Sequence, residues 1–70
     1  MPTTTLSTVT EAFEALGRQL GPGSLALGPI CTRVMLRTGV NMKDPRPDQQ
    51  CDAALVAKVV AALADMGHRL

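Results

Sequence analysis

The chain has 70 residues, a formal net charge of +1 and 46% hydrophobic residues, with Phe13 as its one aromatic side chain. This length makes one domain, residues 1–70, and the near-neutral charge excludes a general electrostatic attraction to nucleic acid or to an acidic membrane surface. Without Trp or Tyr, the core must be built from aliphatic residues and Met, which favours closely packed helices. We therefore predict an all-α fold, a small three-helix bundle with an irregular Pro-rich connection before its C-terminal helix.

The chain shows no targeting or membrane-spanning segment. Its first residues, Met-Pro-Thr-Thr-Thr, have neither the basic region nor the apolar stretch of a secretory signal. No apolar run approaches the roughly 20 residues that cross a bilayer. We expect a cytoplasmic protein with no membrane partner.

Two cysteines, Cys31 and Cys51, are too few for a disulfide framework. In a reducing compartment we expect both to be free and mostly buried as small apolar residues. Two alternatives stay open, a single bridge between the second and third helices and a metal site that would recruit His68. The chain has no paired Cys-x-x-Cys clamp, so we predict neither a metal ion nor a cofactor.

The first predicted helix covers residues 6–20. Its apolar residues step by three and four along one face and are Leu6, Val9, Phe13, Leu16 and Leu20. Thr8 and Glu11 have the spacing of a capping box, although Thr5 or Ser7 would serve equally well as the first residue of the helix. Gly21 and Pro22 end it.

The second predicted helix covers residues 29–38, with Pro29 at its first position, where the missing amide costs nothing. Its apolar face holds Ile30, Cys31, Val34 and Met35. Leu36 points roughly the opposite way, which indicates that a second side of this helix is covered. After Gly39 the connection 40–47 contains two prolines, and its apolar residues Val40 and Met42 can hold it against the core.

The third predicted helix, residues 48–66, is the strongest signal in the chain. Its larger apolar side chains fall within an arc of roughly 140°, and alanines cover most of the remaining surface. Only Lys58 and Asp65 form a narrow charged strip. Either Asp48 or Asp52 caps the start of the helix, and Gly67 suits its end. A helix this apolar must be covered on more than one side.

No motif in the chain carries catalytic chemistry. There is one histidine, no serine in a nucleophile-elbow motif, and no phosphate-binding loop around Pro22. Asp44, Asp48 and Asp52 are better explained as caps at a helix start than as a carboxylate site. We predict that the protein is not an enzyme and has no catalytic residues.

Two segments resemble parts of helix-turn-helix proteins. Residues 34–41, an apolar helix ending in Gly-Val-Asn, are similar to the first helix and turn of such a unit. Residues 57–69 resemble the third helix of lactose-repressor-type headpieces, where an Ala/Leu-rich helix ends in Leu-Gly-Tyr-Arg. The resemblance implies DNA binding, but it assigns the chain to no family. The recognition helix should follow Gly39 directly, and Pro45 and Pro47 exclude a regular helix interior there.

If nucleic acid is bound, the contacts are expected to be to phosphates and to come from four basic residues, Arg33, Arg37, Lys43 and Arg46. This nucleic-acid-binding or transcription and replication accessory role is the alternative function. A solvated polar face explains the same residues without any ligand.

The function that the sequence favours is a small non-catalytic protein-interaction module, an adaptor or inhibitor that associates with itself or with another protein. The apolar last helix, the outward Leu36 and the near-zero charge are its basis, because self-association would relieve the small core. We expect a homodimer joined through the second and third helices, with Leu36, Val56 and Val60 at the contact. The predicted core is Val9, Phe13, Leu16, Leu20, Ile30, Val34, Leu55, Val59, Leu63 and Met66.

Overall fold

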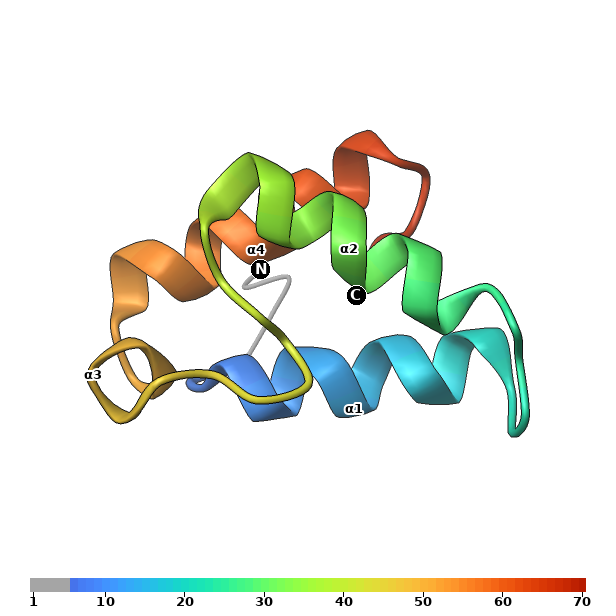
Figure 1. The fold of residues 1–70 in the computed structure, drawn as a ribbon, viewed down its shortest axis with the longest axis horizontal. Helices are drawn as coiled ribbons and strands as arrows, with labels where there is room; N and C mark the ends of the chain where they lie inside the picture. Colours follow the sequence, from blue (N-terminus) through green and yellow to red (C-terminus); the bar gives the residue numbers. More distant parts are fainter. Residues whose placement is uncertain (1–5) are drawn as a thin grey trace, which may run out of the picture.

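In the computed structural model, residues 6–70 are described, and within them the chain forms four helices and no strand. The helices are α1 (Val9–Leu20), α2 (Leu27–Thr38), α3 (Pro47–Gln50) and α4 (Ala53–Asp65). Figure 1 shows α1 running along one side of the molecule, with α2 and α4 on the other side. The predicted all-α class is confirmed. The expectation about a secretory signal concerns residues 1–5, outside the described residues.

Helix α1 begins at Val9, three residues later than predicted, because Thr8 caps it through the capping box with Glu11. Thr8 Oγ1 accepts a hydrogen bond from the amide of Glu11 at 3.1 Å, and Glu11 Oε1 accepts one from the amide of Thr8 at 3.0 Å. Of the possible first residues of the helix, Thr8 and neither Thr5 nor Ser7 supplies the cap. At the other end Gly21, with φ of 90°, follows the last helical residue.

Helix α2 begins at Leu27, two residues earlier than predicted, so Pro29 is its third residue and not its first. None of the first four amide groups of a helix has an acceptor within the helix. A proline, which lacks this amide hydrogen, is therefore tolerated at the third position as well as at the first. The helix ends as expected at Thr38, where Gly39 has φ of 77° and donates to the carbonyl of Met35 at 2.8 Å.

The predicted helix 48–66 is divided in two. A single turn, α3, ends at Gln50, and Asp52 then caps α4 in an extended conformation. Asp52 Oδ1 accepts from the amides of Ala54 and Leu55 at 3.0 and 3.3 Å, so Asp52 and not Asp48 is the cap of the long helix. At its far end Gly67 has φ of 90°, as predicted from its position.

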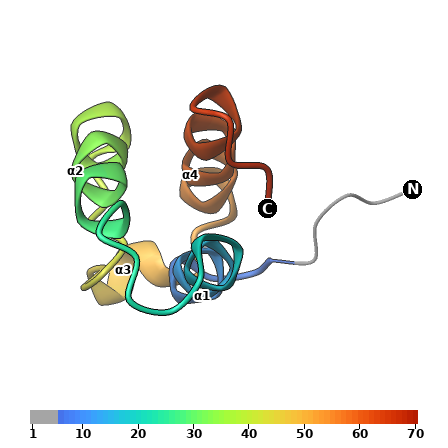
Figure 2. The ribbon, with the colours of Figure 1, turned by 90° about the vertical axis from the view of Figure 1, so that its right-hand side faces the viewer.

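The three longer helices enclose the core. Figure 2 shows α2 and α4 side by side with α1 crossing beneath them, and α2 and α4 make the most extensive helix contact. Six predicted core residues are buried, and Phe13, Leu20, Leu55 and Met66 pack against them while partly exposed. The connection 40–46 is held as expected, with Val40 and Met42 fully inside. The buried apolar residues are Val9, Ala12, Leu16, Ile30, Cys31, Val34, Val40, Met42, Val56, Val59, Ala62 and Leu63.

Candidate interaction surface

A groove runs along the side of α4 that faces away from the core, with a volume of about 540 Å³. Leu6 and Ser7, just before α1, line it opposite α4, and Cys51 lies at its edge beside the start of α4. The residues that α4 contributes are Ala53, Val56, Ala57, Val60, Ala61 and Ala64. We call this feature the α4 groove.

The composition of the α4 groove follows from the pattern of α4. Leu63 and Val59 are buried against the other helices, and the alanines that share the opposite side of the helix are exposed. Val60 is half-buried at the boundary between the two sides. Because alanine side chains are short, the surface of α4 lies close to its backbone along this side, and another helix can approach it closely.

A second groove lies on the opposite flank of α4, where this helix meets the C-terminal end of α2. It has a volume of about 410 Å³, and its lining includes Arg37, Lys58, Ala61 and Asp65. Arg37 Nη1 donates to Asp65 Oδ2 at 2.8 Å, which joins the two helices by an ion pair. Ala61 lines both grooves, so they adjoin one exposed strip of α4.

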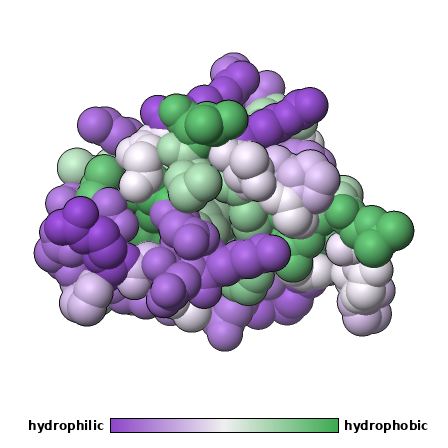
Figure 3. Space-filling view, viewed as in Figure 1, coloured by the Kyte–Doolittle hydropathy of each residue, from purple (hydrophilic) through white to green (hydrophobic). Residues whose placement is uncertain are grey.

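The structure brings two of the three predicted partner-binding residues together. Val56 and Val60 both line the α4 groove, although Val56 is only 5% exposed and belongs mainly to the core. Leu36 is 79% exposed on α2 but lines neither groove. Figure 3 shows an apolar area over α2 that is separate from another over the connection between α1 and α2. Sequence reasoning missed the alanines of the groove as site residues, although their spacing on one side of the helix was the available signal.

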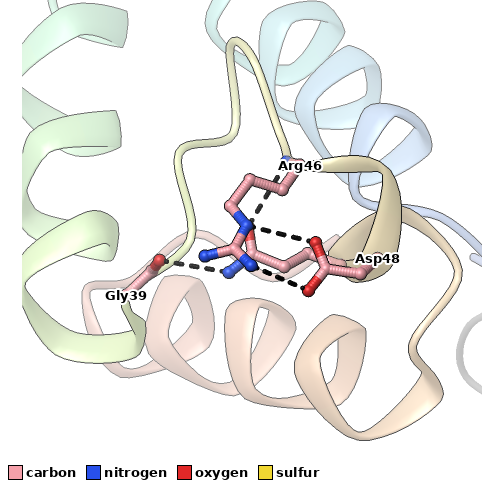
Figure 4. Close-up of polar contacts among 4 residues, drawn as sticks. Gly39, Arg46 and Asp48 are labelled. Carbon is pink, nitrogen blue, oxygen red and sulfur yellow. Dashed lines mark hydrogen bonds and ion pairs between the residues drawn. The ribbon is translucent and has the colours of Figure 1, made fainter.

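The four predicted basic residues do not act as one group of unpaired cations. Arg37 pairs with Asp65, and Arg46 forms a two-point contact with Asp48, its Nε and Nη2 each 3.1 Å from a carboxylate oxygen. Figure 4 shows the Arg46 guanidinium turned toward the Asp48 carboxylate. Arg33 and Lys43 are exposed, one on α2 and one in the connection after it. Carboxylates beside two of the four cations reduce the positive potential that phosphate binding needs.

The segment that follows α2 also differs from a helix-turn-helix unit. Residues 39–46 lie outside any helix, and α3 has only four residues. No recognition helix therefore follows Gly39, as the prolines of this segment predicted.

The cysteines have different environments. Cys31 is buried in the core, and this burial raises the pKa of its thiol, an effect that the nearby Lys43 ammonium partly opposes. Cys51 is exposed, which corrects the expectation that both would be mostly buried. Its position explains this, because it ends α3 at the junction with α4. Both thiols are free, and the bridge between them is absent.

Residues 6–70 contain no group of three or more His, Cys, Asp or Glu side chains that could hold a metal ion. Within the same residues, no helix has the length and apolarity of a membrane span. Comparisons of the chain with family models, curated proteins and solved structures found no match.

Proposed function

We propose that this chain is a small non-catalytic helical interaction module that binds a partner helix along the exposed side of α4. The observation that carries the proposal is the α4 groove, which has a volume of about 540 Å³ and is lined mainly by the alanines and valines of one helix. Such a module acts by occupying a surface of its partner, as an adaptor or an inhibitor does.

The chemistry of the lining favours a helix over a small molecule. A small-molecule site combines apolar walls with several placed polar groups that fix the ligand's orientation. Among the described residues that line the α4 groove, only Ser7 and Cys51 have polar side chains, and neither belongs to α4. A helix satisfies its own backbone hydrogen bonds and needs only shape and apolar contact, which this lining provides.

The cost of leaving the surface uncovered points the same way. A chain of this size has a marginal core, and each square ångström of apolar surface removed from water contributes about 25 cal/mol. Covering the alanine-rich side of α4 therefore adds stability that the isolated fold lacks. Nucleic-acid binding is supported less well, because Asp65 and Asp48 pair with two of the four candidate cations.

The test is site-specific photo-crosslinking in the cells that make the protein. A photoreactive residue replaces Ala57, in the middle of the α4 groove, and in a matched control it replaces Ala26, an exposed alanine just before α2. We expect a covalent adduct at Ala57 and none at Ala26. Equal labelling at both positions, or no adduct at Ala57, would contradict the proposal.

A further inference from the structure

The exposed strip of α4 has one flank that carries opposite charges. Lys58 and Asp65 both line the groove between α2 and α4, and they lie seven residues apart, which places them on the same side of the helix two turns apart. Asp65 Oδ2 accepts from Arg37, but the Asp65 side chain is 73% exposed, so its other oxygen is accessible to a second cation. Lys58 makes no ion pair within residues 6–70.

The exposed strip of α4 consists of Ala57, Val60, Ala61 and Ala64, and these residues can pair with the same four residues of a second copy. If two copies of α4 lie antiparallel about a two-fold axis between Val60 and Ala61, then Ala57 of one copy faces Ala64 of the other. Val60 of one copy faces Ala61 of the other in the same way. Every pair across such a contact contains at least one alanine, so the helix axes can approach to the short end of the usual distance, about 8 Å.

We infer that the occupant of the α4 groove is a second copy of this chain, with the two α4 helices antiparallel and Lys58 of each copy paired with Asp65 of the other. This inference rests on the proposed function and names the partner. A two-fold axis perpendicular to both helices keeps the charged flanks on one side of the contact. Lys58 of one copy and Asp65 of the other then lie only about 3 Å apart along the direction of the helix axes.

The charges also select the direction of the pairing. In a parallel two-fold pair the charged flanks fall on opposite sides of the contact, so Lys58 meets no carboxylate from the second copy. The antiparallel arrangement gives two equivalent ion pairs at the margin of an apolar contact. Charge pairs at such margins commonly fix the orientation and the choice of partner.

The size of the contact sets the strength to expect. Helix α4 has 13 residues and is therefore about 20 Å long. A pair of helices of this length buries less than the roughly 1,200 Å² that stable complexes need, which is typical of weak association. We expect a dissociation constant in the micromolar range, so the experiment covers concentrations up to about 1 mM.

The test uses two charge-reversal variants, Lys58→Glu and Asp65→Lys, in sedimentation equilibrium. In either variant alone, both ion pairs of the homodimer become repulsive, and we expect association to weaken roughly tenfold or more. When the two variants are mixed, both contacts of each heterodimer become attractive again. In one contact the two substituted side chains face each other with opposite charges, and in the other the unchanged Lys58 faces the unchanged Asp65. Mixing should therefore restore dimers at concentrations where each variant alone is monomeric.

Circular dichroism verifies that each variant is folded. If Asp65→Lys disturbs the fold by repelling Arg37, the same pair of variants is made with Arg37→Gln, which removes that repulsion. Dimers that form in each variant alone as in the wild type, or no recovery on mixing, would overturn the antiparallel pairing. A wild-type protein that stays monomeric at about 1 mM, together with an Ala57 adduct to a different protein, would overturn the second copy but leave the interaction module intact.

Discussion

At the scale of single residues, side-chain hydrogen bonds to backbone amides mark where α1 and α4 begin. The Thr8–Glu11 capping box was predictable, because both partners lie within one turn of sequence. The choice between Asp48 and Asp52 was not, since both residue types suit a cap. Asp48 instead pairs with Arg46, and Asp52 accepts from two amides of α4.

The two thiols should react at very different rates with a thiol reagent. Cys51 is exposed and should be labelled quickly in the folded protein, whereas Cys31 is buried and its raised pKa keeps it protonated. Absorbance-monitored titration should therefore show one fast and one slow thiol. As the pH rises through the range in which thiols ordinarily ionise, the labelling rate of Cys31 should increase at a higher pH than the labelling rate of a cysteine in an unfolded reference peptide.

Cys51→Ser supplies the control for this measurement, because it should remove the fast phase and leave the slow one. Two fast thiols in the folded wild type would contradict the burial of Cys31.

At the scale of elements, the positions of the helices were predictable but their connections were not. The stepping of apolar residues located α1, α2 and α4 to within a few residues, because periodicity reports the buried face directly. Just before the break between α3 and α4, the side chain of Gln50 contacts α1. Gln50 Oε1 accepts from the amide of Thr10 at 2.7 Å, and its Nε2 donates to Thr10 Oγ1 at 2.6 Å. A contact across 40 residues leaves no local signal in the sequence.

This contact gives a prediction about stability. Gln50→Ala removes the acceptor for a part-buried amide in the first turn of α1, which should cost about 1 kcal/mol. For a domain of this size the melting temperature should fall by about 4–8 °C. Thermal unfolding followed by circular dichroism measures the change.

Gln49→Ala is the matched control. It has the same change in helix propensity, but the bonds of Gln49 to Gly39 and Arg46 are both 3.4 Å long and exposed. A loss for Gln50→Ala no larger than for Gln49→Ala would show that the contact with Thr10 contributes nothing.

At the scale of the whole molecule, α1 crosses beneath α2 and α4, and one side of α4 is not covered by any other helix of residues 6–70 (Figure 2). The sequence indicated that such a surface should exist, since only two other predicted helices were available to cover this apolar helix. The predicted dimer contact through Leu36, Val56 and Val60 stays a prediction. In the folded chain Val56 and Val60 line the α4 groove, whereas Leu36 lines neither groove beside α4. Where Leu36 lies relative to these grooves depends on the packing angle between α2 and α4, which no residue pattern specifies.

The most direct test of the α4 surface is sedimentation equilibrium of three proteins over a concentration series up to about 1 mM. The wild type should approach twice the monomer mass. Ala57→Glu should remain monomeric, because a carboxylate in the apolar contact loses its hydration without gaining a partner. Leu36→Glu, a change at an exposed position on α2, should associate like the wild type. Dissociation caused by Leu36→Glu and not by Ala57→Glu would contradict the account and move the contact to α2.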